Sequence, residues 1–308
     1  MSILFAGTPE TAALSLRELV RAGVPISLVL TRTDAPVGRK KVLTPSPVAL
    51  VAEELGIPII RSNDVDTDTI AKLKDANIKF AIVIAYGVIL RQPALEAIPK
   101  GWFNLHYSLL PKWRGAAPVQ RTLLSGEKET GVTLFKIDQG LDTGDVLGTV
   151  TTEIQAGENS GDLLVRLSAL GVSLLLEELP KIESGLAVFT PQVSQEASLA
   201  PKLSRFEAEL DFHRSAVELE NLVRGSNPEP GAWVTAGSLG ELKVFNARAR
   251  VESSLKVGEC GLVSGMVLVG CTVGALELIE VQPSGKKRMN AQDWFRGFNR
   301  TLTLGRHV

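Results

Sequence analysis

Two side chains suited to chemistry stand two residues apart in the segment 103–118, FNLHYSLLPKWRGAAP. The segment begins as a short strand, and residues i and i+2 of a strand point to the same face. Asn104 and His106 are therefore expected to present an amide and an imidazole together. Imidazole is the side chain best suited to moving protons near neutral pH. The pair predicts a catalytic site, while a core histidine satisfied by backbone groups remains the structural alternative.

A carboxylate that could join this pair lies in residues 137–145, IDQGLDTGD, where glycines bracket Asp142 between two β-rich runs. Such a loop can return a carboxylate to a neighbouring strand end. Asp142 beside His106 would hold the ring and favour the protonated imidazole. An ordinary Asp-Gly turn explains the same residues when they are taken alone. The other histidines, His213 and His307, do not lie where an α/β site is expected.

The elements that must position these residues alternate along the first half of the chain. Short β-branched runs at 3–6, 25–30, 57–60 and 80–85 are separated by helical patterns at 11–22, 47–55 and 68–76. This order predicts an α/β domain with a Rossmann-like, parallel-rich sheet, whose ligands bind at the carboxyl ends of the strands. Gly7 starts GTPET, which lacks the GxGxxG pattern, so we expect a tight turn and no dinucleotide site.

A second composition follows the dense helical pattern at 161–179. Residues 190–201 lose periodicity and contain two prolines, which is typical of a linker. A short helix at 215–223 and small strands at 242–245, 261–263, 266–269 and 276–281 then predict a little OB-like barrel. The predicted domains are 1–189, a linker at 190–207, and 208–308.

Composition bounds the class of protein. The chain has 308 residues, 44% hydrophobic and 22% charged, as in ordinary globular proteins. The start, MSILFAGTPE, predicts neither a signal peptide nor a membrane span. Two cysteines, Cys260 and Cys271, are too few for a disulfide framework and indicate the cytoplasm, and we expect no metal site.

Charge is unevenly distributed although the net charge is only −1. Residues 241–308 hold ten Lys or Arg against six Asp or Glu. This local excess indicates a polyanionic partner or, equally, a solvated surface.

These motifs together resemble the folate-dependent formyltransferases. The element NxHxSLLPxxRG followed by LDTG carries the resemblance, and it extends through FAGTPE, VGRKKVLTPSPV, IAYGVIL, RGSNPEPGAW and VQPSGKKRM. The form SLLPKWRGAAPVQ is similar to the branch that acts on methionyl-tRNA. The resemblance implies a Rossmann-like catalytic domain, a linker and an OB-like C-terminal domain.

The resemblance also assigns roles. It implies that Asn104, His106 and Asp142 are catalytic, that 10-formyltetrahydrofolate is the co-substrate and that no metal takes part. The expected folate contacts lie in two short segments: Ser108, Leu109, Leu110, Pro111, and Ala85, Tyr86, Gly87. Within residues 80–90, Val83 and Ile84 are more typical of core.

The implied acceptor is the amine of initiator methionyl-tRNA. The long basic loop 32–46 would enter the acceptor stem with Arg39, Lys40 and Lys41, and the turn with Lys286, Lys287 and Arg288 would add affinity for phosphates. The resemblance implies a monomer. The alternatives are a formyltransferase for a small amine or a sugar nucleotide, a related hydrolase that transfers the formyl group to water, and a non-catalytic RNA-binding module.

Overall fold

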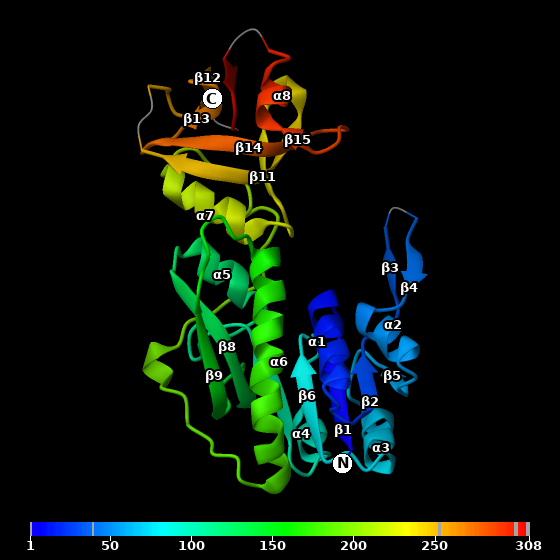
Figure 1. Ribbon diagram of the computed structural model, residues 1–308. Helices are drawn as coiled ribbons and strands as arrows, with labels where there is room; N and C mark the ends of the chain where they lie inside the picture. Colours follow the sequence, from blue (N-terminus) through cyan, green and yellow to red (C-terminus); the bar gives the residue numbers. More distant parts are fainter. Residues whose placement is uncertain (1, 39, 252–253, 299–300, 306–308) are drawn as a thin grey trace. The chain divides into compact units, whose positions relative to one another are not determined.

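The computed structural model describes residues 2–38, 40–251, 254–298 and 301–305. The chain divides into two compact units (Figure 1). The first unit consists of Met1–Gly115, Thr130–Thr152 and Leu164–Leu199. The second unit consists of Ala116–Glu129, Glu153–Leu163 and Ala200–Val308.

The first unit is built on a seven-stranded sheet with the order β5-β2-β1-β6-β7-β8-β9. Its strands are β1 (Ile3–Gly7), β2 (Ile26–Thr31), β5 (Ile59–Arg61), β6 (Phe80–Ile84), β7 (Trp102–His106), β8 (Glu129–Lys136) and β9 (Val146–Glu153). Strands β5, β2, β1, β6 and β7 are parallel, and β8 is antiparallel to β7. The central strands β1 and β6 are buried along their whole length, as expected for a sheet covered on both faces. The predicted parallel-rich α/β fold is confirmed.

Helices connect these strands and cover them. They are α1 (Glu10–Arg21), α2 (Pro47–Glu54), α3 (Thr67–Asp75), α4 (Gln92–Glu96) and α6 (Ser160–Ser184), with a 3-10 turn η1 (Ser194–Glu196) after α6. Side-chain caps fix two starts: Ser46 accepts from the N–H of Ala49 before α2, and Asp66 accepts from that of Thr69 before α3. Helix α6 continues past the predicted end at residue 179 and contains Pro180. Proline lacks the N–H that a helix interior uses, but Pro180 nevertheless lies within this helix.

The predicted basic loop 32–46 contains a small hairpin. Strands β3 (Ala35–Val37) and β4 (Val42–Thr44) pair antiparallel, and the turn between them uses positive φ angles at Gly38 and Lys41. Three-residue strands are too short to show alternation in the sequence, so the pattern indicated only a long connection. The hairpin exposes apolar side chains, since Leu43 is 68% exposed.

The second unit is an antiparallel sheet that nearly closes on itself. Its strands are β10 (Ala232–Thr235), β11 (Glu241–Arg250), β12 (Glu259–Val263), β13 (Met266–Gly270), β14 (Ala275–Pro283), β15 (Met289–Asn290) and β16 (Leu302–Thr303). The order is β10-β11-β14-β13-β12-β16, with β15 paired to β14. The N–H of Gly305 donates to the carbonyl of Thr235 at 2.8 Å, so the two ends of the sheet meet. The predicted small β domain is confirmed.

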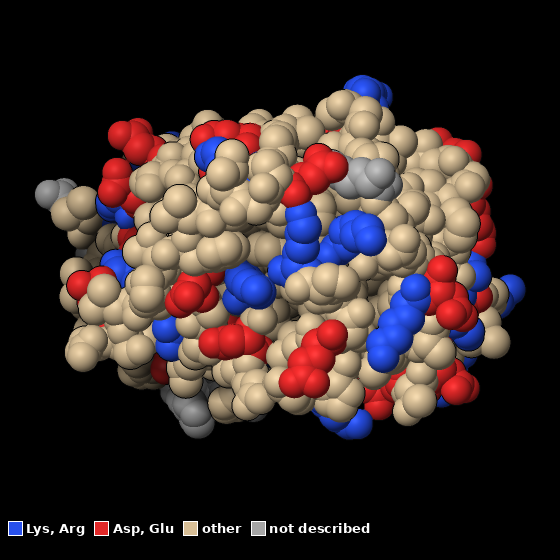
Figure 2. Space-filling model, turned by 90° about the horizontal axis from the view of Figure 1, so that it is seen from below, with Lys and Arg blue, Asp and Glu red and all other residues tan. Residues whose placement is uncertain are grey.

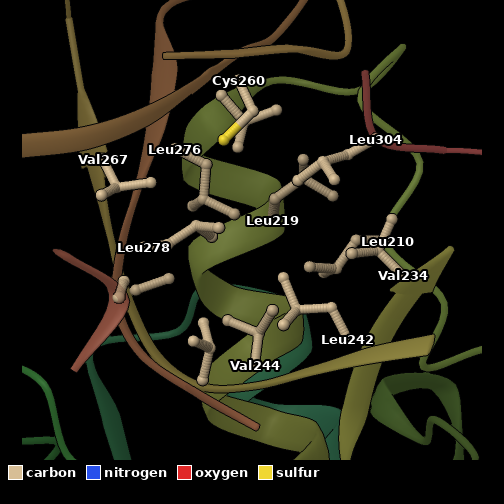
Figure 3. Close-up of a cluster of buried hydrophobic side chains, with 14 of the residues drawn as sticks. Leu210, Leu219, Val234, Leu242, Val244, Cys260, Val267, Leu276, Leu278 and Leu304 are labelled. Atoms are coloured by element: carbon tan, nitrogen blue, oxygen red, sulfur yellow. The ribbon is translucent and has the colours of Figure 1, made fainter. Parts of the chain in front are cut away.

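Helix α7 (Ala216–Ser226) supplies one side of the core of this unit. A capping box starts it, in which Ser215 and Glu218 each bond to the other's backbone N–H. Leu219 is fully buried and points among strand side chains that include Leu276 and Leu278 (Figure 3). The remaining helical pieces of the unit are α5 (Pro118–Leu124), η2 (Gly237–Leu239) and α8 (Ala291–Phe295).

The sequence contains nearly equal numbers of basic and acidic residues, and both kinds lie on the surface. Figure 2 shows one face on which Lys and Arg side chains are interspersed with Asp and Glu. Within the residues described, no helix is both long enough and apolar enough to cross a membrane.

Replacing Leu219 with Ala should lower the free energy of unfolding of the second unit by about 2–5 kcal/mol, because it removes fully buried methyl groups and leaves a cavity. Val217 lies on the same helix but is 62% exposed, so Val217→Ala should cost about 0.5 kcal/mol or less. Urea denaturation of both variants measures the difference. Equal losses would show that α7 does not bury its Leu219 face.

Candidate functional site

The site lies where three parallel strands end side by side. Gly7 of β1 pairs with Ile84 of β6, and Val83 of β6 pairs with Asn104 of β7, so the residues that follow these strands share one edge of the sheet. The Thr8 hydroxyl donates to the Tyr86 carbonyl at 2.8 Å and joins two of these ends. A Cβ on Gly7 would lie 2.9 Å from the Ile84 carbonyl oxygen. Glycine is therefore required at this position for close packing.

Asn104 and His106 lie on the same face of β7, as the spacing predicted. Their partners on β8 are Phe135 and Thr133, respectively. The His106 side chain is only 6% exposed and meets the Phe135 ring edge-on, with centroids 6.4 Å apart. Asn104 is half-buried. The imidazole is thus held inside the strand-end site and has little contact with solvent.

The two ring nitrogens of His106 have different neighbours. Nε2 donates to the Trp113 carbonyl oxygen at 2.9 Å. A carbonyl only accepts, so this bond assigns a proton to Nε2 in either charge state. Nδ1 faces Oδ2 of Asp142 at 3.8 Å, which is too long for a hydrogen bond but close enough for charge attraction. Nδ1 is therefore the position that gains and loses a proton.

Asp142 reaches the histidine from the loop between β8 and β9. Its Oδ2 accepts from the Gly115 N–H at 2.7 Å, and its φ of 52° lies in the left-handed region that Asp tolerates better than most residues. A Cβ on Gly144 would lie 1.7 Å from the Lys136 carbonyl oxygen. The glycine two residues after Asp142 therefore lets the loop pack closely against the end of β8. The structure brings Asn104, His106 and Asp142 to one site.

Burial has the largest effect on the pKa of the His106 imidazole in the free protein. It lowers the pKa of the imidazole, and this effect outweighs Asp142 and the bond to the Trp113 carbonyl, which both raise that pKa. Asp142 therefore favours the protonated imidazole, as expected, but burial is the larger effect on its pKa. Asp142 acts in the expected direction, but at 3.8 Å it does not offset the loss of hydration.

The segment after β7 presents apolar surface. Leu109, Leu110 and Pro111 are half-buried, whereas Ser108 is fully buried and its hydroxyl donates to the Lys112 carbonyl at 2.7 Å. Ser108 therefore shapes the turn, and the three residues after it provide accessible surface.

The segment after β6 presents backbone. Ala85 and Gly87 are exposed with positive φ angles of 48° and 79°. Tyr86 is 1% exposed, its hydroxyl donates to the Ser62 carbonyl at 2.9 Å, and burial raises its pKa to about 12. The Tyr86 ring therefore belongs to the core, together with Val83 and Ile84 as predicted.

The predicted basic contacts lie on two exposed turns. Lys40 and Lys41 are exposed in the β3–β4 turn, and Arg39 lies outside the described residues. Lys286 and Lys287 are exposed before β15. Arg288 pairs with Glu280 at 2.5 Å and lies over the Phe245 ring at 4.2 Å, so its guanidinium already has partners.

The cysteines lie apart from this site. Cys260 and Cys271 are buried and unpaired, and burial raises their pKa values to about 12 and about 11. Within the described part of the chain, His, Cys, Asp and Glu form no group of three or more that could hold a metal.

Sequence reasoning missed a pair beside the site, which consists of buried Arg114 and half-buried Gln192. Arg114 is 8% exposed, and its Nη2 donates to Oε1 of Gln192 at 2.7 Å. The amide nitrogen of Gln192 donates to the carbonyl oxygens of Asp142 at 2.9 Å and Gly144 at 2.8 Å. Arg114 stands in the WRGAAP motif, but nothing in the non-periodic segment around Gln192 marked it as a site residue.

Comparison with family models identifies the class. Residues 1–179 match the model described as formyl transferase, and residues 202–299 match that of the formyl transferase C-terminal domain. This chain belongs to the formyl transferase family.

Individual members of the family are also similar to this chain over nearly its whole length. The chain is similar to the methionyl-tRNA formyltransferases of Arthrobacter sp. strain FB24 and Paenarthrobacter aurescens strain TC1, with 47% and 48% identity. Each match covers 96% of this chain and 97% of the relative. Among solved structures, WlaRD, a sugar 3N-formyl transferase crystallised with dTDP and 5-N-formyl-THF, superposes with a TM-score of 0.69 at 19% identity. That match covers 93% of this chain and 99% of WlaRD, and supports the same fold.

Acidification should cost the wild-type protein more stability than a His106→Gln variant. The unfolded imidazole has a pKa near 6.5, and the folded one is lower, so below about pH 6.5 the unfolded state binds more protons. The contribution of His106 to folding stability is present above that pH and is lost as pH falls toward the folded pKa. Urea denaturation of both proteins from pH 7.5 to 5 measures the difference, and a wild type that gains stability over the variant on acidification contradicts the assignment.

Proposed function

We propose that this chain transfers the formyl group of 10-formyltetrahydrofolate to the α-amino group of methionyl-tRNA, giving N-formylmethionyl-tRNA for translation initiation. The observation that carries the proposal is the meeting of His106 and Asp142 at 3.8 Å beside Asn104, at the strand ends of a formyl transferase fold. The full-length similarity to methionyl-tRNA formyltransferases supports the acceptor. The 5-N-formyl-THF present with WlaRD supports a folate donor.

The donor would bind along the two segments that follow β6 and β7. Leu109, Leu110 and Pro111 offer apolar surface for one face of a flat ring. The exposed backbone at Ala85 and Gly87 offers donors and acceptors for its polar edge, which is the combination that small-molecule sites use. Ser108 and Tyr86 stabilise these turns through their hydrogen bonds to the Lys112 and Ser62 carbonyls.

The acceptor supplies its own nucleophile. An α-amino group has a reference pKa near 7.7 to 8.0, so a substantial fraction is uncharged around neutral pH. Its nitrogen attacks the formyl carbon, a C–N bond forms, and an electron pair moves to the formyl oxygen. The Asn104 amide is the donor placed to stabilise that oxygen as charge develops.

His106 moves the proton that this reaction must relocate. Nδ1 is unprotonated in the free protein and can take a proton from the attacking nitrogen, while Nε2 stays bound to Trp113. The imidazolium that forms is stabilised by Asp142. Nδ1 then returns the proton to N10 of the folate as the oxygen electron pair re-forms the C=O bond and the bond between N10 and the formyl carbon breaks. Atoms and charge balance without a covalent intermediate on the protein.

The tRNA would be held by phosphate contacts outside the catalytic residues. Arg39, Lys40 and Lys41 belong to the turn of an exposed hairpin, and Lys286 and Lys287 are exposed before β15. Such contacts add salt-dependent affinity rather than base specificity. Residues 1–189 then act as the catalytic domain and 208–308 as the RNA-binding domain, joined by 190–207.

We assign the chain to the cytoplasm as a monomer. Its two buried, unpaired thiols suit a reducing compartment.

The deciding experiment follows labelled formyl from 10-formyltetrahydrofolate. Methionyl-tRNA, glycinamide ribonucleotide and a reaction without acceptor are run in parallel. Label on the aminoacyl end of the tRNA is the expected result. Label on the small amine or in free formate would support 10-formyltetrahydrofolate as the formyl donor but would exclude methionyl-tRNA as the acceptor. No release of label, with tRNA still bound, indicates a non-catalytic RNA-binding module.

Replacing His106 or Asp142 with Ala should lower kcat for methionyl-tRNA by about 100-fold or more, because proton transfer typically contributes a factor of 10² to 10⁴. Folate affinity should change by less than about threefold, since neither side chain belongs to the apolar surface at 109–111. Single-turnover transfer and a folate-binding titration measure the two quantities. A fully active His106→Ala variant removes the proposed mechanism.

Replacing Lys40 and Lys41 together with Ala should raise KM for methionyl-tRNA several-fold and leave KM for the folate unchanged. Each lost phosphate contact should also reduce the slope of log K against log salt by about one. Lys72→Ala with Lys74→Ala is the matched control, because these lysines are exposed in the last turn of α3, which precedes the amino end of β6. Equal effects of the two double substitutions would show that the hairpin lysines contribute only general positive charge and no specific contact with the tRNA.

A further inference from the structure

A segment after α6 contacts both loops that complete the catalytic site. We call residues 190–199 the connecting segment. Thr190 exchanges two backbone hydrogen bonds with Val146, each 2.8 Å long, just beyond the Asp142 loop. Ser198 lies against the other loop, where its hydroxyl accepts from the Trp113 N–H at 2.9 Å and its carbonyl accepts from the Arg114 N–H at 2.8 Å. The connecting segment therefore lies between residues 113–115 and the Asp142 loop.

Gln192 is the side chain of this segment that joins the two loops. Its Oε1 accepts from Nε of Arg114 at 3.1 Å and from Nη2 at 2.7 Å. Its Nε2 donates to the carbonyl oxygens of Asp142 and Gly144. One amide thereby uses its acceptor on one loop and both donor hydrogens on the other, which is its full donor capacity.

The two loops joined by Gln192 are those that fix His106 and Asp142. Trp113 provides the carbonyl that accepts from Nε2 of His106, and Gly115 provides the N–H that binds the Asp142 carboxylate. Arg114 stands between them and is 8% exposed, so its guanidinium has little water to replace the Gln192 amide. Losing this amide would leave buried polar groups without partners on both loops.

We propose that Gln192 is a positioning residue for formyl transfer: it sets the separation of Asp142 and His106 by holding the Asp142 loop against residues 113–115. Gln192 touches neither the substrate nor the reacting atoms in this role. The proposal rests on the proposed function for its kinetic consequence, while the loop contacts stand independently of it. Changing such supporting contacts typically costs about 10- to 100-fold in activity.

The variant Gln192→Ala should lower kcat about 10- to 100-fold and change KM for the folate by less than about threefold. Gln192→Glu is the informative companion, because it keeps the size and the acceptor for Arg114 but cannot donate to the Asp142 and Gly144 carbonyls when ionised. It should lose activity like Gln192→Ala. Gln195→Ala is the matched control, since Gln195 is exposed in the same segment, and it should retain wild-type rates.

A double-mutant cycle with Asp142→Asn separates positioning from general structural damage. If Gln192 acts through Asp142, adding Gln192→Ala to Asp142→Asn should lower kcat by less than about twofold further. A full additional 10-fold loss in that background overturns the proposal. So does a Gln192→Glu variant with wild-type kcat.

Hydrogen exchange tests the same proposal without any substrate. Peptides covering 111–117 and 138–146 should both exchange faster in Gln192→Ala than in wild type, with no change in Gln195→Ala. Unchanged exchange in both peptides overturns the proposal. If wild-type protein transfers no formyl to methionyl-tRNA, the proposed function fails, and the exchange result still decides whether Gln192 holds the two loops.

Discussion

The constraint on which the site depends is the removal of one imidazole from water. His106 is 6% exposed, so each of its ring nitrogens needs a defined neighbour. The Trp113 carbonyl takes one and the Asp142 carboxylate faces the other. Neither neighbour belongs to β7. The chain must therefore bring two loops to the end of β7. One loop precedes β8 in the sequence and the other follows it.

The same burial lowers the pKa of the histidine by more than Asp142 raises it. A carboxylate at hydrogen-bond distance would raise the pKa of the imidazole further, but Asp142 stands at 3.8 Å and also binds the Gly115 N–H. Its negative charge is therefore shared with a second partner. A neutral ring with a free Nδ1 can accept a proton from an amine, which a protonated ring cannot do. This geometry supports the proposed proton transfer by His106, with Asn104 as the proposed donor to the developing oxyanion.

The sequence predicted most of the fold because the fold relies on periodic patterns. The buried strands Ile3–Gly7 and Phe80–Ile84 and the alternation of strand and helix identify a parallel sheet, and i, i+2 spacing places Asn104 beside His106. The hairpin at 35–44 was not predicted, because each of its strands has only three residues and shows no alternation. The sequence left open whether His106 is exposed or a core histidine bonded to backbone, since its burial depends on contacts from β8 and Trp113. The roles of the site residues and the boundary at 190–207 stay predictions.

Gln192 shows why a linker pattern in sequence does not imply an unconstrained segment in space. Non-periodic, proline-containing residues form no helix or strand, but their side chains can still satisfy buried groups of neighbouring elements. Arg114 is such a group, because a guanidinium that is 8% exposed has few water molecules available and the Gln192 amide accepts two of its N–H groups. A segment that supplies this amide has to follow a fixed path past the Asp142 loop. The proposed catalytic geometry therefore relies on contacts from a part of the chain that carries no sequence pattern of its own.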